Sequence, residues 1–294
     1  MIGVRHLAAL LLLLGIAVVM PLIAIPQATY DTVVVFDITQ SMDVEDYGGG
    51  AAGSAATSRI EYARQAARRI LRDLPCGSRI GWAAFAEYRT ILLLAPIEVC
   101  ANYNDLVAAL SRLDGRMRWG EASEITKGVY WAIRVAQSLE PHPDLVFLTD
   151  GQEAPPIAPD DAPALFDDFR HGLVHGWLVG VGGRDAQPIP RTTPDGRRVG
   201  TWHADEVMQV PGDPASHEEL SYVREDHLKS LAQHVGFDYV HLDGEAALRQ
   251  AILDPRHARR APVLTDLSWV LVAAALLLLA WRLKPDVPLH GNWR

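Results

Sequence analysis

The sequence predicts an α/β fold, namely a doubly wound, mainly parallel sheet with one antiparallel edge hairpin, flanked by N- and C-terminal transmembrane helices. Three observations lead to this prediction. Short apolar runs alternate with amphipathic runs through the middle of the chain. Carboxylates and hydroxyls directly follow two of the apolar runs. Uncharged apolar stretches lie near both ends of the chain.

Composition limits the kinds of partner. The chain has 294 residues, of which 49% are hydrophobic, and its mean hydropathy of +0.05 is higher than that of an ordinary soluble domain. Its 27 basic and 36 acidic residues give a net charge of −9. Nucleic-acid binding requires clustered positive charge, so this balance argues against a nucleic-acid partner.

The apolar segments 7–25 and 267–281 approach the length of a membrane helix. We expect residues 1–27 to form a retained membrane anchor, with a cleavable signal peptide as the alternative. Arg5 precedes the first segment and no basic residue follows it until Arg59. The positive-inside rule therefore predicts a cytoplasmic N-terminus, whereas the basic residues around the second segment are divided between its two sides. With the oxidising compartment that the cysteines require, we expect both termini to be cytoplasmic and the middle of the chain to lie outside. In this scheme the C-terminal part consists of a linker with a transmembrane helix over 257–284 and a cytoplasmic tail over 285–294.

The elements between the anchors are expected in a regular order. The β-branched run 32–36 is typical of a central parallel strand that is buried on both faces. Ser58 and Glu61 form a capping box, so a helix begins there. The elements that follow are a hairpin over 79–85 and 88–94, helices near 104–113 and from 125, strands over 145–148 and 173–179, and a closing helix, strand and helix over 227–234, 239–242 and 245–253.

Two stretches interrupt this order. Residues 43–57 are rich in Gly and Ala and predict a loop, in which the acidic residues Asp43, Glu45 and Asp46 are interpreted as solvated. Residues 183–222 contain five prolines, and the turn signal at 194–196 predicts an inserted hairpin.

The chain has two cysteines, Cys76 and Cys100, one on each side of the expected hairpin. Pairing across that hairpin brings them side by side just beyond its open end. We therefore predict a disulfide, which requires an oxidising compartment, and two unrelated reduced thiols are the alternative.

Polar residues at the ends of two strands suggest a binding site. Asp37, Thr39 and Ser41 follow the first strand, and Asp150 follows the strand 145–148. Ligands of doubly wound sheets bind at the carboxyl ends of the strands, where the loop ending in Ser123 would add another hydroxyl. Oxygen ligands without His or Cys favour a hard cation, Mg²⁺ before Mn²⁺ or Ca²⁺.

The two loops resemble a known family. Asp37-Ile38-Thr39-Gln40-Ser41 together with Thr149-Asp150-Gly151 is similar to the metal-ion-dependent adhesion site of von Willebrand factor A domains, whose first loop reads Asp-x-Ser-x-Ser. The resemblance implies such a domain over 28–256. It also implies a hydroxyl ligand from a middle loop, which is Ser123 or, as the competing match, Thr126.

The flanking apolar segments are similar to those of bacterial Bat-type proteins, commonly encoded beside AAA+ ATPases of the MoxR type. The segments FDITQSM, LPCGSRIGWAAF and RMRWGEASEITKGVYWAI resemble A-domain accessory proteins encoded with periplasmic methanol dehydrogenase. That group is implicated in maturing the quinoprotein, including its calcium insertion. The resemblance implies an inner-membrane protein with a periplasmic domain. Its expected partners are a client or assembly factor that offers an Asp or Glu, a MoxR-type ATPase and other A-domain proteins.

We expect a binding protein and not an enzyme, in which the metal bridges to a carboxylate of the partner. A phosphatase with Asp37 as nucleophile is an alternative, but such hydrolases need a second Asp two positions later, where this chain has Thr39. No Gly-x-Ser-x-Gly motif is present. A structural scaffold that binds its partner without metal is the other alternative.

Overall fold

The computed structural model describes residues 4–48, 56–157 and 172–282. The predicted tail 285–294 and part of the predicted loop 43–57 lie outside the described residues. The chain divides into two compact units, one made of Met1–Gln27 with Arg260–Arg294 and the other of Ala28–Arg259. Each unit is described by itself.

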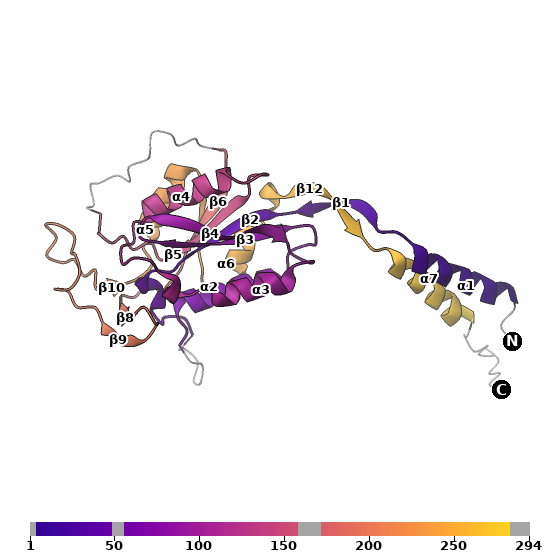
Figure 1. Cartoon of the computed structure of the whole chain (residues 1–294), viewed down its shortest axis with the longest axis horizontal. Helices are drawn as coiled ribbons and strands as arrows, with labels where there is room; N and C mark the ends of the chain where they lie inside the picture. The colour runs from indigo at the N-terminus through magenta and orange to yellow at the C-terminus, as the bar shows by residue number, and fades with distance from the viewer. Residues whose placement is uncertain (1–3, 49–55, 158–171, 283–294) are drawn as a thin grey trace, which may run out of the picture. The chain divides into compact units, whose positions relative to one another are not determined.

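A six-stranded sheet in the order β11-β6-β5-β2-β3-β4 forms the centre of the larger unit (Figure 1). All neighbouring strands are parallel except β3 and β4, which confirms the mainly parallel sheet with one antiparallel edge. The strands are β2 (Asp31–Asp37), β3 (Arg79–Ala86), β4 (Arg89–Glu98), β5 (Asp144–Thr149), β6 (Gly176–Gly180) and β11 (Asp238–His241).

Helices cover both faces of this sheet. Side chains alternate between the faces of a strand, so Val34 and Phe36 of β2 enter one apolar core and Val33 and Val35 enter the other. The first core is completed by α2 (Arg59–Ile70), α3 (Tyr103–Arg112) and α6 (Glu245–Ile252), and the second by α4 (Ile125–Gln137) and α5 (Glu225–Val235).

The start of α2 follows the predicted cap. Ser58 is the N-cap, and its side chain accepts a hydrogen bond from the Glu61 backbone amide at 3.4 Å. The Glu61 side chain instead contacts Arg64 and Gln65, so only one half of the expected capping box is present. The structure also has short 3₁₀ helices after β2, α3 and α6. They are η1 (Gln40–Asp43), η2 (Gly115–Met117) and η3 (Pro255–His257).

The edge hairpin is formed by β3 and β4, and its turn is Glu87–Tyr88, one residue later than expected. Register irregularities between Ile80 and Ala83 shift the pairing towards the open end of the hairpin. Cys76 and Cys100 lie there with a Cα–Cα distance of 5.3 Å and form the predicted disulfide.

The segment 183–222 contains the predicted hairpin. Strands β8 (Pro190–Thr192) and β9 (Arg198–Thr201) pair antiparallel around a turn in which Gly196 has φ +83°. A second small ladder joins β7 (Gln187–Pro188) to β10 (Leu220–Ser221).

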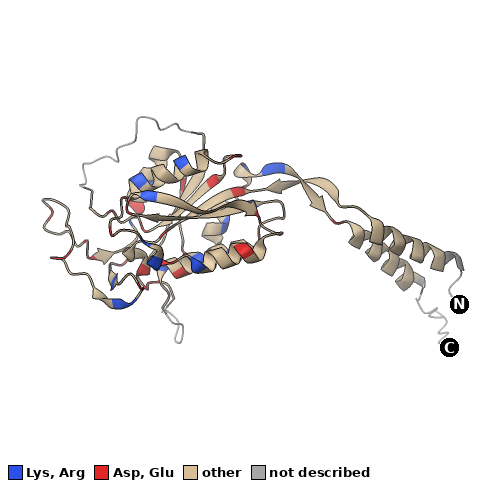
Figure 2. Cartoon of the chain, viewed as in Figure 1, with Lys and Arg blue, Asp and Glu red and all other residues tan. Residues whose placement is uncertain are grey.

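The smaller unit holds two apolar helices, α1 (Val4–Val19) and α7 (Ser268–Arg282), which lie against each other. They carry no charged residue over 7–19 or 268–281 (Figure 2). Strands β1 (Ile23–Thr29) and β12 (Arg259–Thr265) form a two-stranded ladder, which the sequence did not predict.

The transmembrane helices expected over 7–25 and 267–281 are not found as spans. Helix α1 ends at Val19, before Pro21, because the residue preceding a proline is disfavoured in helical conformation. Among the described residues, no helix combines the length and apolar character that crossing a membrane requires.

Candidate functional site

The carboxyl ends of β2 and β5 bring Asp37 and Asp150 together. The two strands are adjacent and parallel, with Phe36 opposite Leu148, so the residues that follow them share one edge of the sheet. Both aspartates are fully buried. The Thr149 hydroxyl donates a hydrogen bond to Asp37 Oδ2 at 2.6 Å and links the two loops.

The first loop folds back on the Asp37 carboxylate. Asp37 Oδ1 accepts hydrogen bonds from the Thr39 backbone amide at 2.9 Å and from the Thr39 hydroxyl at 2.7 Å. The hydroxyls of Thr39 and Ser41 are 3.2 Å apart. One carboxylate and two hydroxyls of the predicted set therefore converge within five residues.

Ser123 joins the loop before α4 to the loop that follows Asp150. Its backbone amide donates to the Ala154 carbonyl at 2.7 Å, and the Ala154 amide donates to the Ser123 carbonyl at 2.8 Å. The Ser123 hydroxyl oxygen is buried and has no hydrogen-bond partner among the described residues. Because leaving a buried hydroxyl unpaired costs stability, this oxygen is suited to a ligand.

Thr126, the competing match, has a different partner. Its hydroxyl donates a hydrogen bond to Glu153 Oε1 at 3.0 Å, and its amide donates to the same oxygen. Glu153 Oε2 accepts from the Ile125 amide at 2.8 Å. Glu153 thus satisfies the first amides of α4, a role that sequence reasoning missed because it depends on contact between two loops. The geometry favours Ser123 over Thr126 as the available hydroxyl.

Sequence reasoning also missed a buried cation behind the site. Arg59 is fully buried, and its Nη1 donates to Asp150 Oδ2 at 2.7 Å. The Ser221 hydroxyl donates to the same Asp150 oxygen at 2.8 Å. Asp46, expected to be solvated, is instead paired with Arg59 at 2.6 Å. An arginine at the start of an amphipathic helix gives no local signal of such a pairing.

Burial and charge set the protonation of Asp37. Removal from water raises the pKa of Asp37 to about 7, and the nearby charge of Asp150 adds to this, against the lowering effect of the Thr149 and Thr39 hydrogen bonds. A cation bound between the two carboxylates would favour the ionised form of Asp37.

The donor set fits a hard cation. Asp37, Thr39, Ser41 and Ser123 offer a carboxylate and hydroxyl oxygens, which Mg²⁺, Mn²⁺ and Ca²⁺ accept. A second group of ligand-type residues, Cys76, Glu98 and Cys100, also comes together among the described residues. Its two sulfurs are joined to each other, so it is no metal site.

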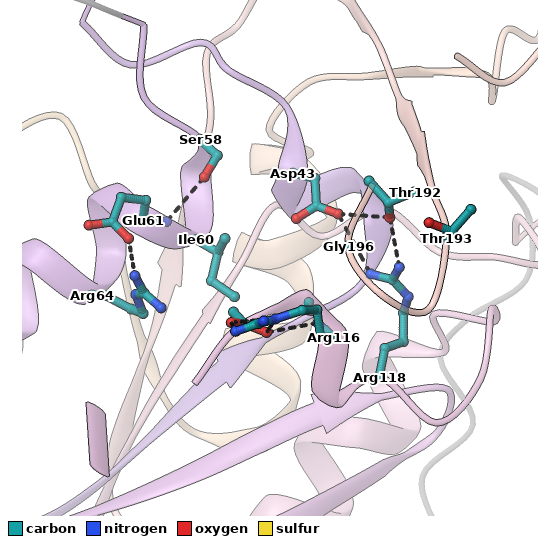
Figure 3. Close-up of a pocket in the computed structure, with 12 residues that line it drawn as sticks. Asp43, Ser58, Ile60, Glu61, Arg64, Arg116, Arg118, Thr192, Thr193 and Gly196 are labelled. Carbon is teal, nitrogen blue, oxygen red and sulfur yellow. Dashed lines mark hydrogen bonds and ion pairs between the residues drawn. The ribbon is translucent and has the colours of Figure 1, made fainter. Parts of the chain in front are cut away.

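A polar pocket of about 270 Å³ lies beside the first loop (Figure 3). Its walls come from the start of α2, from η2 and from the β8–β9 turn. Three arginines line it, and each is paired with a carboxylate, as Arg64–Glu61, Arg116–Asp114 and Arg118–Asp43. Because these charges are already balanced, the pocket is no evident anion site.

Comparisons with known proteins bear on the family and fold to which the chain is similar. The family model for the von Willebrand factor type A domain matches residues 32–152, the segment that runs from β2 through both aspartates. Residues 32–152 are therefore similar to von Willebrand factor type A domains. The match includes Asp37, Thr39, Ser41, Ser123 and Asp150.

Two curated relatives are UPF0353 proteins. The chain is 26% identical over 183 residues to one from Mycobacterium avium and 26% identical over 182 residues to one from Mycolicibacterium vanbaalenii. Each alignment covers 56% of the chain and 50% of the relative. The chain therefore spans about half the length of these relatives.

Solved structures show the same fold. An aerotolerance-related membrane protein from Bacteroides fragilis superposes with a TM-score of 0.52 at 16% identity, covering 76% of this chain and 97% of that one. BatB from Bacteroides thetaiotaomicron gives a TM-score of 0.51 at 17% identity, covering 76% and 98%. At these identities the similarity concerns the fold alone.

Proposed function

We propose that this von Willebrand factor A domain is a non-enzymatic binding module that holds a protein partner through a metal ion. Asp37, Thr39, Ser41 and Ser123, with Asp150 beside them, would hold Mg²⁺, or Mn²⁺ or Ca²⁺ in its place. When bound, the ion supplies an electrophilic centre. An Asp or Glu of the partner would complete its coordination shell.

The observation that carries this proposal is the Ser123 hydroxyl. It is buried, has no hydrogen-bond partner among the described residues, and belongs to the loop that the Ala154 bridge ties to the Asp150 loop. The other hydroxyls, of Thr39 and Ser41, already point toward each other beside Asp37. A cation gives the unpaired oxygen a partner.

The chemistry of the first loop supports binding over catalysis. A phosphatase with Asp37 as nucleophile needs an acid two residues later, and the Thr39 hydroxyl found there donates to Asp37 itself. Neutral hydroxyl ligands leave a divalent ion with unbalanced positive charge, which attracts an external carboxylate.

The smaller unit supports attachment to a membrane. Large apolar side chains of α1 and α7 are exposed, including Leu11, Val18, Trp269 and Leu277. We propose that these helices bind the bacterial inner membrane and that the disulfide-bonded domain faces the oxidising periplasm. The named membrane protein from Bacteroides fragilis shares the fold of the domain.

The resemblance noted in the sequence suggests which partners to test. We propose assembly or maturation of an exported enzyme, with a calcium-dependent quinoprotein such as methanol dehydrogenase as the first client and calcium insertion as the first step to examine. A MoxR-type ATPase and other A-domain proteins are the accessory partners to examine.

The test is capture of such a client on the full chain, solubilised in detergent, with Mg²⁺ present. We expect EDTA to release the client, re-addition of Mg²⁺ to restore binding, and Asp37→Asn and Ser123→Ala to reduce capture by about tenfold or more, equal to roughly 1.4 kcal/mol. Ser111→Ala, which changes an exposed serine of α3, is the matched control.

Capture that is unchanged by EDTA and by both variants would support the metal-independent scaffold instead. Calorimetry of the same variants with Mn²⁺ separates loss of metal from loss of the partner surface. A variant that binds Mn²⁺ normally but loses the client would place the defect in the partner contact.

A further inference from the structure

Arg59 connects the first loop, the Asp150 loop and the segment at Ser221 behind the candidate site. Its guanidinium donates to Asp150 Oδ2 at 2.7 Å, to the Ser41 carbonyl at 3.3 Å, and to the Ser221 hydroxyl at 2.6 Å. Its other edge donates twice to Asp46 Oδ2, at 2.9 and 2.6 Å. The side chains of Arg59 and Asp150 are both 0% exposed.

The charge of this guanidinium is divided between two carboxylates. Burial lowers the pKa of Arg59, but the charges of Asp150 and Asp46 outweigh burial and leave its pKa above the ordinary value. Arg59 is therefore a permanent cation in contact with Asp150. Both side chains are shielded from solvent and in direct contact, so their charges act on one another more strongly than they would at the surface.

A cation in this position changes the net charge that surrounds a bound metal ion. Two ionised aspartates alone would offer a divalent ion two negative charges. Arg59 cancels part of the charge of Asp150, whereas Asp46 offsets part of the charge of Arg59. The electrostatic potential at the site thus depends on Asp37 and on three charged side chains behind it, Asp150, Arg59 and Asp46.

We infer that Arg59 is a built-in counter-cation of Asp150 that keeps the affinity of the site for divalent metal low until a partner carboxylate adds negative charge. This inference rests on the proposed function. Metal and partner then bind cooperatively. If the partner raises the affinity of the site for metal by some factor, bound metal raises the affinity for the partner by the same factor.

The two ion-pair partners of Arg59 provide a sharp test by Mn²⁺ calorimetry on the full chain. Arg59→Gln removes the competing cation, so we expect Mn²⁺ affinity to rise about tenfold. Asp46→Asn leaves Arg59 with Asp150 alone, so we expect affinity to fall by a similar factor. Arg59→Lys keeps the charge and should stay near wild type. Asp73→Asn, an exposed aspartate paired with Arg249, controls for net charge.

A purely structural role predicts a different pattern, in which Arg59→Gln and Asp46→Asn both weaken Mn²⁺ binding in proportion to their loss of thermal stability. That result would overturn the inference. If Arg59→Gln does not fold, Asp46→Asn decides alone. Weaker Mn²⁺ binding without a matching loss of thermal stability supports the inference, whereas unchanged or tighter binding, or weakening in proportion to lost stability, contradicts it. Failure of the wild type to bind Mn²⁺ would instead contradict the proposed function.

Discussion

Asp37 and Asp150 follow adjacent parallel strands, yet they meet different partners. Asp37 accepts hydrogen bonds from neutral groups of Thr39 and Thr149, whereas Asp150 faces the Arg59 guanidinium. The sequence could place the aspartates, because both follow buried apolar runs. It could not supply Arg59, because the pairing joins side chains 91 positions apart and depends on how α2 packs.

At the opposite end of β5, Asp144 gives a residue-scale prediction for stability. Burial raises the pKa of Asp144 to about 6, despite the lowering effect of His257 and Arg259. A carboxyl with a raised folded-state pKa stabilises the fold fully below its unfolded pKa of 3.8, and this contribution is lost as pH rises through 6.

As pH rises from 4 to 7, we therefore expect the free energy of unfolding of Asp144→Asn to fall by about 2 kcal/mol less than that of wild type. Urea unfolding at a series of pH values measures this difference. Asp185→Asn, at an exposed position, should follow the wild-type curve. Parallel curves for wild type and Asp144→Asn would show that Asp144 ionises as it does in the unfolded chain.

At the scale of elements, the sequence pattern correctly predicted the features that depend on interactions between residues close together in the chain. The run 32–36 became the central strand β2 because its side chains can be buried on both faces. The disulfide followed from hairpin geometry, and the turn at 194–196 from Gly196. These features depend on residues that lie close together in the sequence.

Elements that depend on distant pairing were missed. The ladder of β1 and β12 joins segments over 200 positions apart, as in the 2.9 Å hydrogen bond from Gln27 to Thr265. Residues 23–25 were consequently assigned to a helix although they belong to β1. Similarly, Glu153 satisfies the amides of α4 from another loop, so spacing alone could not decide between Ser123 and Thr126.

At the scale of the molecule, an acidic domain is joined to an apolar helical unit. The exposed side chains of α1 and α7 predict that the full chain binds lipid vesicles, whatever the depth of insertion. In a flotation assay, Leu277→Glu should reduce the vesicle-bound fraction severalfold, because a charge in an apolar lipid environment costs about 2.5–3.5 kcal/mol.

Val199→Glu is the matched control, since Val199 is likewise exposed, at 55% against 70% for Leu277, but lies on the β8–β9 hairpin of the other unit. Equal flotation of both variants and wild type would argue against attachment through α7.

The most direct test of the central claim is anomalous scattering from crystals of the full chain grown with Mn²⁺. We expect a strong manganese peak in contact with Asp37, Ser41 and Ser123, and we expect it to be lost in Asp37→Asn. Water alone between the Asp37 and Asp150 loops, at saturating Mn²⁺, would contradict it.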